Sequence, residues 1–105
     1  MPSLEQLQRA LDTSPGDAFL LYGLAMEHAR LGDHQAALDP FARAVEADPA
    51  NPYHHYHMAR SLEALGRAQD ARAVLEAGLE QAKIHHDTHA QSELTEFLDR
   101  LEDED

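Results

Sequence analysis

The first residues in this chain that suggest chemistry are His54, His55 and His57, which stand within four positions in the stretch NPYHHYHMAR. Neutral imidazole is a frequent ligand of zinc and related metals. His54 and His57 are three residues apart, so on a helix they share one face and are candidates to bind one metal ion. His55 points to another face of such a helix, and we expect it to face the core if the chain is built of stacked helical repeats.

A second cluster, His85, His86 and His89, surrounds Asp87 and falls at a helix end and in the turn that follows it. The chain has no cysteine and therefore no thiolate ligand, and it lacks an HExxH motif. The alternative is that the histidines of both clusters are polar surface and loop residues, one of them partly buried. We adopt that alternative and predict no metal site.

Other catalytic patterns are also missing from the sequence. There is no glycine-rich phosphate loop, no GxSxG motif and no cysteine nucleophile. Nothing in the spacing of the serine, histidine and aspartate residues places them together. We therefore expect a protein that is not an enzyme and needs no cofactor.

The charge of the chain is strongly negative. Twenty acidic residues face eight basic ones, and the formal net charge is −12. Such a chain repels phosphate backbones, so we expect no binding to nucleic acid. The acids are spread along the chain, which favours a halophile-like adaptation to high salt over attraction to a basic partner. Protonating all eight histidines would bring the net charge to −4. The histidine content is therefore compatible with a pH sensor and also with a solubility that merely depends on pH.

The sequence also gives indications of the cellular compartment of the protein. The absence of cysteine fits a reducing interior, and the N-terminus has no basic region followed by an apolar one. The longest uncharged apolar run, residues 18–26, is far too short to cross a membrane. We expect a cytoplasmic protein with no membrane partner.

Shifting the chain by about thirty-four residues aligns it with itself, at a spacing known for helical repeats. The aligned residues are small, apolar or turn-forming, the types that fix close helix packing and chain reversal. The identical pairs include Ala10 and Ala44, Pro15 and Pro49, Tyr22 and Tyr56, Ala25 and Ala59, Leu31-Gly32 and Leu65-Gly66, and Ala37 and Ala71.

Helical spacing of apolar residues runs through the whole chain, and strand alternation is nowhere sustained. Ser3 with Gln6 and Thr88 with Gln91 have the pattern of capping boxes, and Ser14-Pro15 is expected to open the second helix. Gly32 and Gly66 are expected to end helices in the left-handed conformation. The predicted helices are 3–13, one from Ser14-Pro15 to 31, one after Asp33 to 47, 52–65, 68–83 and 88–102.

This unit resembles the tetratricopeptide repeat, a helix-turn-helix of the same length. The matching residues in one repeat are Leu21, Leu24, Ala25, His28, Ala37, Phe41 and Pro49. In the next repeat they are His55, Met58, Ala59, Leu62, Ala71 and Leu75, with Lys83 in place of proline.

The resemblance implies an all-α fold of about six helices, in which antiparallel helix-turn-helix repeats stack as a short solenoid. A single domain, 1–105, is then divided into a half-repeat helix (3–15), repeat one (16–49), repeat two (50–83), a capping helix (88–102) and an acidic tail (103–105).

Pro40 departs from a regular helical pattern, since it stands in the middle of the helix after Asp33. A proline inside a helix removes one hydrogen bond and clashes with the preceding turn, at about 3 kcal/mol. We predict a kink near residues 36–40, or a helix that restarts with Asp39 as its cap.

The resemblance further implies a concave groove, lined by the first helix of each repeat, that binds a peptide or a partner's helix. Tyrosine combines apolar area with one hydroxyl, and an arginine can hold a carboxylate, so recognition is a fitting role. The tyrosines are equally suited to packing, for example under the last helix. The residues expected to face the groove are Phe19, Tyr22, Met26, Arg30, Tyr53, Tyr56, Arg60 and Glu63.

We therefore expect a protein-interaction module whose partner is another protein or a peptide. The alternative is a structural homodimer that pairs through the groove or an exposed face. A histidine-based metal-binding protein is a more remote alternative.

Overall fold

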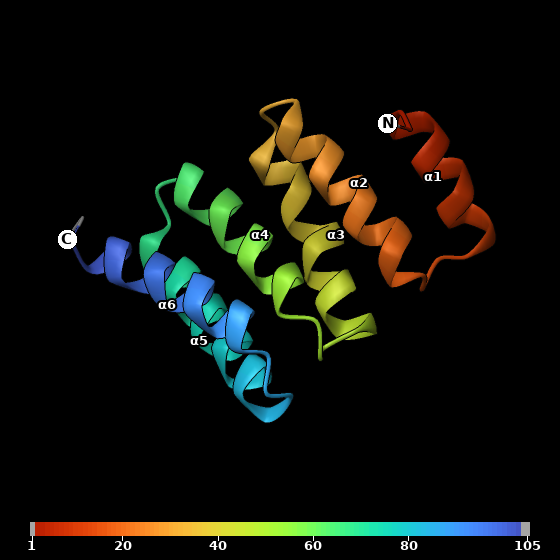
Figure 1. The fold of residues 1–105 in the computed structure, drawn as a ribbon. Coiled ribbons are helices and arrows are strands. Elements are labelled where there is room, and N and C mark those ends of the chain that lie inside the picture. The colour runs from red at the N-terminus through yellow and green to blue at the C-terminus, as the bar shows by residue number, and fades with distance from the viewer. Residues whose placement is uncertain (1, 104–105) are drawn as a thin grey trace.

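The computed structural model describes residues 2–103, which form six α-helices and no strand (Figure 1). Short turns join the helices, so each runs antiparallel to the one before it. The all-α solenoid predicted from the sequence is confirmed. The helices are α1 (Leu4–Thr13), α2 (Ala18–Arg30), α3 (His34–Ala47), α4 (Pro52–Ala64), α5 (Ala68–Ile84) and α6 (Thr88–Asp103).

The helices stack along the chain, with α1 at one end of the molecule and α6 at the other (Figure 1). Consecutive helices pack against each other, and in addition α4 contacts both α2 and α6. Helices α2, α4 and α6 thus form one layer, with α3 and α5 behind it. The molecule measures 39 × 30 × 20 Å.

Small residues form the closest contacts between the helices. Ala25, Ala37, Ala59 and Ala71 have no exposed surface, as the repeat pattern predicts. Phe41 and Leu75 are also fully buried and fill the space between the layers, whereas Met58 is only partly buried. Under the last helix, Leu94, Phe97 and Leu101 complete a continuous core.

Most helices begin at a side chain that accepts a backbone hydrogen bond. The capping box of Ser3 and Gln6 is present, and Asp33 caps α3. Two predicted helix caps are wrong. Asp17, and not Ser14-Pro15, caps α2, because its carboxylate accepts from the amide of Leu20 at 3.1 Å.

The predicted capping box at Thr88 is the second wrong cap, although α6 begins at Thr88 as predicted. Asp87 accepts from the amide of Ala90 at 3.0 Å, and Gln91 donates instead to the backbone carbonyl of Ala82 at 3.3 Å. The aspartate one position earlier occupies the cap because a carboxylate is the stronger acceptor at a helix N-terminus.

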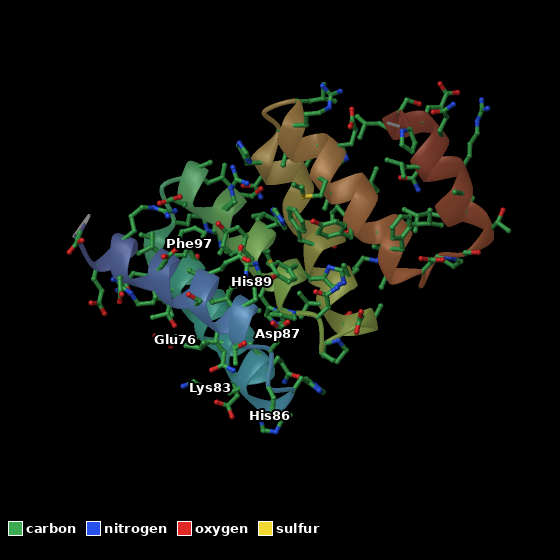
Figure 2. The ribbon with its side chains drawn as sticks, in the orientation of Figure 1. Glu76, Lys83, His86, Asp87, His89 and Phe97 are labelled. Atoms are coloured by element: carbon green, nitrogen blue, oxygen red, sulfur yellow. The ribbon has the colours of Figure 1, made fainter. Side chains whose placement is uncertain are left out.

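Three turns in the chain share one backbone geometry. Gly32 and Gly66 take positive φ angles of 82° and 76°, as predicted, and His86 takes one of 55° in the turn after α5 (Figure 2). In each turn the amide of the next residue bonds a carbonyl five positions earlier, at 2.8–2.9 Å. His86 therefore occupies the position of a glycine, which explains part of the second histidine cluster without any metal.

Helix α3 is continuous across Pro40, from its cap at Asp33 to Ala47. The predicted alternative of a helix restarted at Asp39 is therefore wrong. Pro40 is buried, and the packing of its ring offsets part of the lost hydrogen bond to Ala36. The predicted kink near residues 36–40 stays a prediction.

The C-terminal end of the predicted domain differs slightly from the structure. Helix α6 extends to Asp103, so the first residue of the predicted acidic tail is helical, and residues 104–105 lie outside the described residues. The repeat boundaries stay a prediction. Within residues 2–103 no helix has the length and apolar character needed to span a membrane.

Gly78 gives a direct test of the close contact between α4 and α5. A Cβ atom at Gly78 would lie 2.7 Å from the Cβ of His55, whereas one at Gly23 would meet only Leu7 Cδ2, at 3.3 Å. We expect Gly78→Ala to lower the free energy of unfolding by about 1–3 kcal/mol, through overpacking. Gly23→Ala, the matched control, should be neutral or stabilising by up to about 1 kcal/mol.

Urea unfolding followed by circular dichroism measures both variants. Equal effects of the two substitutions would contradict the close contact at Gly78, since helix propensity alone treats both sites alike.

Candidate functional site

The face shared by α2 and α4 contains two hollows. The first, which we call the basic hollow, has a volume of about 420 Å³ and lies between the C-terminal halves of the two helices and the start of α3. Its walls combine apolar side chains with two arginines and two histidines. The polar and long side chains that line it are Met26, Arg30, His34, His57, Arg60 and Glu63.

The second hollow, which we call the aromatic hollow, has a volume of about 290 Å³ and lies at the N-terminal ends of the same two helices. The turn before α4 closes one side. It is lined chiefly by Phe19, Tyr22, Asp48, Asn51, Tyr53 and His54.

The ring of Tyr22 lies between the two hollows. Its centroid is 5.1 Å from that of His54, which lines the aromatic hollow, and 5.7 Å from that of His57, which lines the basic hollow. Burial raises the pKa of the Tyr22 phenol, so its hydroxyl stays protonated and able to donate. The two hollows are therefore neighbouring parts of one groove.

Seven of the eight residues predicted to face a groove line one hollow or the other. The exception is Tyr56. Its ring packs edge-on against Phe97 of α6, at 5.4 Å between centroids and 72° between planes, and also contacts His57. Tyr56 is thus a packing residue beneath the last helix, one of the two roles that the sequence left open.

The charges in the basic hollow are unevenly paired. Arg30 forms an ion pair with Glu27, a buried carboxylate whose pKa the Arg30 hydrogen bond lowers. Glu63 lies 3.5 Å from Arg100. Arg60 is exposed and has no ion pair or hydrogen bond with any of residues 2–103. Among the residues that the structure describes, Arg60 is therefore the free cation of the groove, in a chain of net charge −12.

The aromatic hollow differs in character. Phe19 is 81% exposed and is the largest exposed apolar side chain among residues 2–103. Tyr53 donates its hydroxyl to Glu93 Oε1 of α6 at 3.1 Å, which holds the ring in position. Asp48 is the only residue with a formal charge among those that line the hollow, apart from the ionisable His54.

His54 is buried, contrary to the expectation that only one histidine of its cluster is. It is 4% exposed, its Nε2 lies 3.8 Å from Asp48 Oδ2, and its Nδ1 has no hydrogen-bond partner. Burial lowers the pKa of His54, of His55 and of His57, so all three are predominantly neutral at pH 7. His55 faces the core as predicted and lies against Gly78.

The metal alternative finds no geometric support in the described residues. Within residues 2–103 no three histidine, aspartate or glutamate side chains come together to hold a metal ion. His54 is instead in ring contact with Tyr22, and His85, His86 and His89 are exposed around the turn before α6. His89 Nε2 pairs with Glu93, one turn along the same helix.

The sequence analysis did not assign several lining residues of the two hollows to the groove. His57 follows Tyr53 by four positions and precedes Arg60 by three, so helical spacing alone could have placed it on the groove face. Asp48 and His34 could not be found this way, because each comes from a neighbouring segment that only the packing of α3 on α4 brings near. Asn51, the cap of α4, gave a signal only for the helix start.

Comparison with known proteins places this fold in a family. Two family models described as tetratricopeptide repeat match residues 28–91 and 3–52. The chain belongs to the tetratricopeptide repeat family. It is 31% identical over 99 residues to the TPR repeat-containing protein PA0015 of Pseudomonas aeruginosa, covering 94% of each chain.

Two solved structures have a similar arrangement of helices. The protein BPP2914 of Bordetella parapertussis is 28% identical, with a TM-score of 0.84 over 100% of this chain and 91% of that one. PcrH, in complex with the chaperone binding region of PopD, has a TM-score of 0.88 at 18% identity, covering 96% of this chain and 77% of PcrH. The family membership supports a role in protein–protein interaction.

The different surroundings of Tyr56 and Phe19 give a test of their roles. Tyr56→Ala removes a half-buried ring from its edge contact with Phe97, and we expect a loss of about 2 kcal/mol in the free energy of unfolding. Phe19→Ala removes an exposed ring and should cost less than about 0.5 kcal/mol. Chemical denaturation measures both, and a larger loss for Phe19→Ala would contradict the packing described here.

The lowered pKa of His54 predicts a pH dependence of stability. Below its ordinary pKa of about 6.5 the unfolded chain binds a proton at this site more readily than the folded one, so the free energy of unfolding falls as the pH drops. The fall continues down to the lowered folded-state pKa. We expect His54→Gln to make this fall shallower between about pH 7.5 and about pH 5.5.

The matched control is His85→Gln, at an exposed histidine after α5. Because acid also relieves repulsion among the carboxylates, the quantity to compare is the difference between each variant and the wild type. An unchanged pH profile for His54→Gln would show that burial of His54 is not linked to folding.

Proposed function

We propose that this chain is a non-catalytic protein-interaction module that binds an extended segment of another protein in the groove between α2 and α4. The observation that carries the proposal is the free cation of Arg60 at the wall of the basic hollow. Family membership supports the general class of function, and PcrH offers an example of the same fold with a bound segment of another protein.

The surroundings of Arg60 favour a carboxylate as its ligand. Met26, Phe41 and Ala64 supply apolar wall, and His57 is predominantly neutral at pH 7. A guanidinium can hold a carboxylate through two parallel hydrogen bonds, and the apolar walls reduce competition from water. An acidic side chain or a C-terminal carboxylate of the partner would fit this position.

The length of the groove favours a short extended segment. Tyr22 and Arg30 are eight residues apart on α2, which at about 1.5 Å per residue is roughly 12 Å. An extended chain advances about 3.3 Å per residue, so about four residues of a partner bridge the two hollows.

Substitution of Arg60 tests the proposal. We expect Arg60→Glu to abolish capture of a partner from the native extract that the wild type retains at about 0.1 M salt, because the carboxylate repels the partner's acid. Lys83→Glu is the matched control. Lys83 is also a cation without an ion pair among residues 2–103, but it lies on α5, away from the groove (Figure 2).

A synthetic segment of the captured partner then allows calorimetric titration. We expect Arg60→Glu to weaken its affinity at least about tenfold and Lys83→Glu less than about twofold. Equal affinities for all three proteins would contradict binding at the basic hollow.

Self-association is the alternative function. A third, largely apolar hollow of about 380 Å³ lies behind the groove, between α3 and α5, where Val45, Met58 and Val74 line it. A wild-type protein that captures nothing, but whose sedimentation shows a dimer forming with concentration, would favour this alternative over a separate partner.

A further inference from the structure

The aromatic hollow has a composition that the proposed binding of a carboxylate does not use. Three aromatic side chains, Phe19, Tyr22 and Tyr53, surround it, and neither lysine nor arginine lines it. Asp48 supplies the one formal negative charge, with its side chain 47% exposed. Binding of an apolar side chain in this hollow would partly desolvate the carboxylate, which costs free energy.

These features together favour a cation. The faces of aromatic rings attract lysine and arginine, and a carboxylate beside them pairs with the same charge. Asp48 is available for such a pair, because its contact with His54, at 3.8 Å, is too long for a hydrogen bond. The positive end of α2 at this site is already met by the carboxylate of Asp17, which caps it.

His54 is a further polar side chain of the aromatic hollow. Its side chain lines the hollow, is 4% exposed, and carries a buried Nδ1 with no partner. With the ring proton on Nε2, toward Asp48, the Nδ1 atom is an acceptor. Buried acceptors are rarely left unsatisfied, and the hydrogen bonding of this side chain is incomplete within residues 2–103.

We infer that the aromatic hollow takes an arginine or lysine side chain of the bound segment, with its cation against the aromatic rings and paired with Asp48. The inference rests on the proposed function for the claim that the cation belongs to a protein. Together the two hollows select a segment that carries a basic and an acidic residue about four positions apart. The basic residue lies toward the N-terminal ends of α2 and α4.

The test uses a small probe, so it does not depend on knowing the partner. The blocked tripeptide acetyl-Gly-Arg-Gly-amide is titrated into the full chain while the ring resonances of Phe19, Tyr22 and Tyr53 are followed by NMR. We expect saturable shifts with this probe, and much smaller shifts with the Glu and Leu analogues, which lack the cation.

Two variants separate the site from general attraction to an acidic protein. Asp48→Asn should weaken binding of the Arg probe about fivefold, because the paired carboxylate is lost. Asp12→Asn removes the same charge from an exposed position on α1 and should change the affinity less than twofold. Amide spectra of each variant confirm that the fold is kept.

Three results would overturn the inference. They are the absence of saturable ring shifts, equal shifts with the Leu probe, and equal weakening by Asp12→Asn and Asp48→Asn. The probe result is also independent of the capture experiment. Binding of the Arg probe without any captured protein would refute the proposed function and leave the cation site standing. Capture of a partner without binding of the Arg probe would refute the cation site and leave the proposed function standing.

Discussion

The structure depends on how closely its helices approach one another. Ala25, Ala37, Ala59 and Ala71 leave room for neighbouring helix axes, and Gly78 lets α5 lie directly against His55. No pair of helices in such a stack buries its apolar face alone, so each relies on the next. The same spacing sets α2 beside α4, and thereby fixes the width of the groove in which both hollows lie.

Charge is distributed in the groove with opposite character at its two ends. Most cations of this acidic chain are paired with carboxylates of their own or neighbouring helices, but Arg60 is not. Burial keeps His54 and His57 predominantly neutral at pH 7, so they separate the cationic wall near Arg60 from the carboxylate of Asp48 without adding charge. The groove therefore has a positively charged wall at the basic hollow and a negatively charged group at the aromatic hollow, a few helical turns apart.

Sequence signals for helix caps and turns were accurate where residues within a single turn or helix end determine the local structure. The turns at Gly32 and Gly66 and the caps at Ser3 and Asp33 were predicted, because each depends only on residues within a few positions. The cap of α2 was misplaced by three residues and the cap of α6 by one residue. In both cases an aspartate competed with the expected cap, and a carboxylate is the better acceptor. Pro40 was expected either to bend its helix or to restart it, and the restart does not occur.

The sequence by itself determined the family and the six helices, and seven of the eight residues that it predicted for the groove line one of the hollows. These predictions succeeded because the repeat period and helical spacing are properties of neighbouring residues. Only the tertiary structure decided that Tyr56 belongs to the core, that His54 is buried, and that the groove is divided into two hollows. Tyr56 meets Phe97 across 41 positions. Contacts of that kind are set by the stacking of whole helices, which no short stretch of sequence specifies.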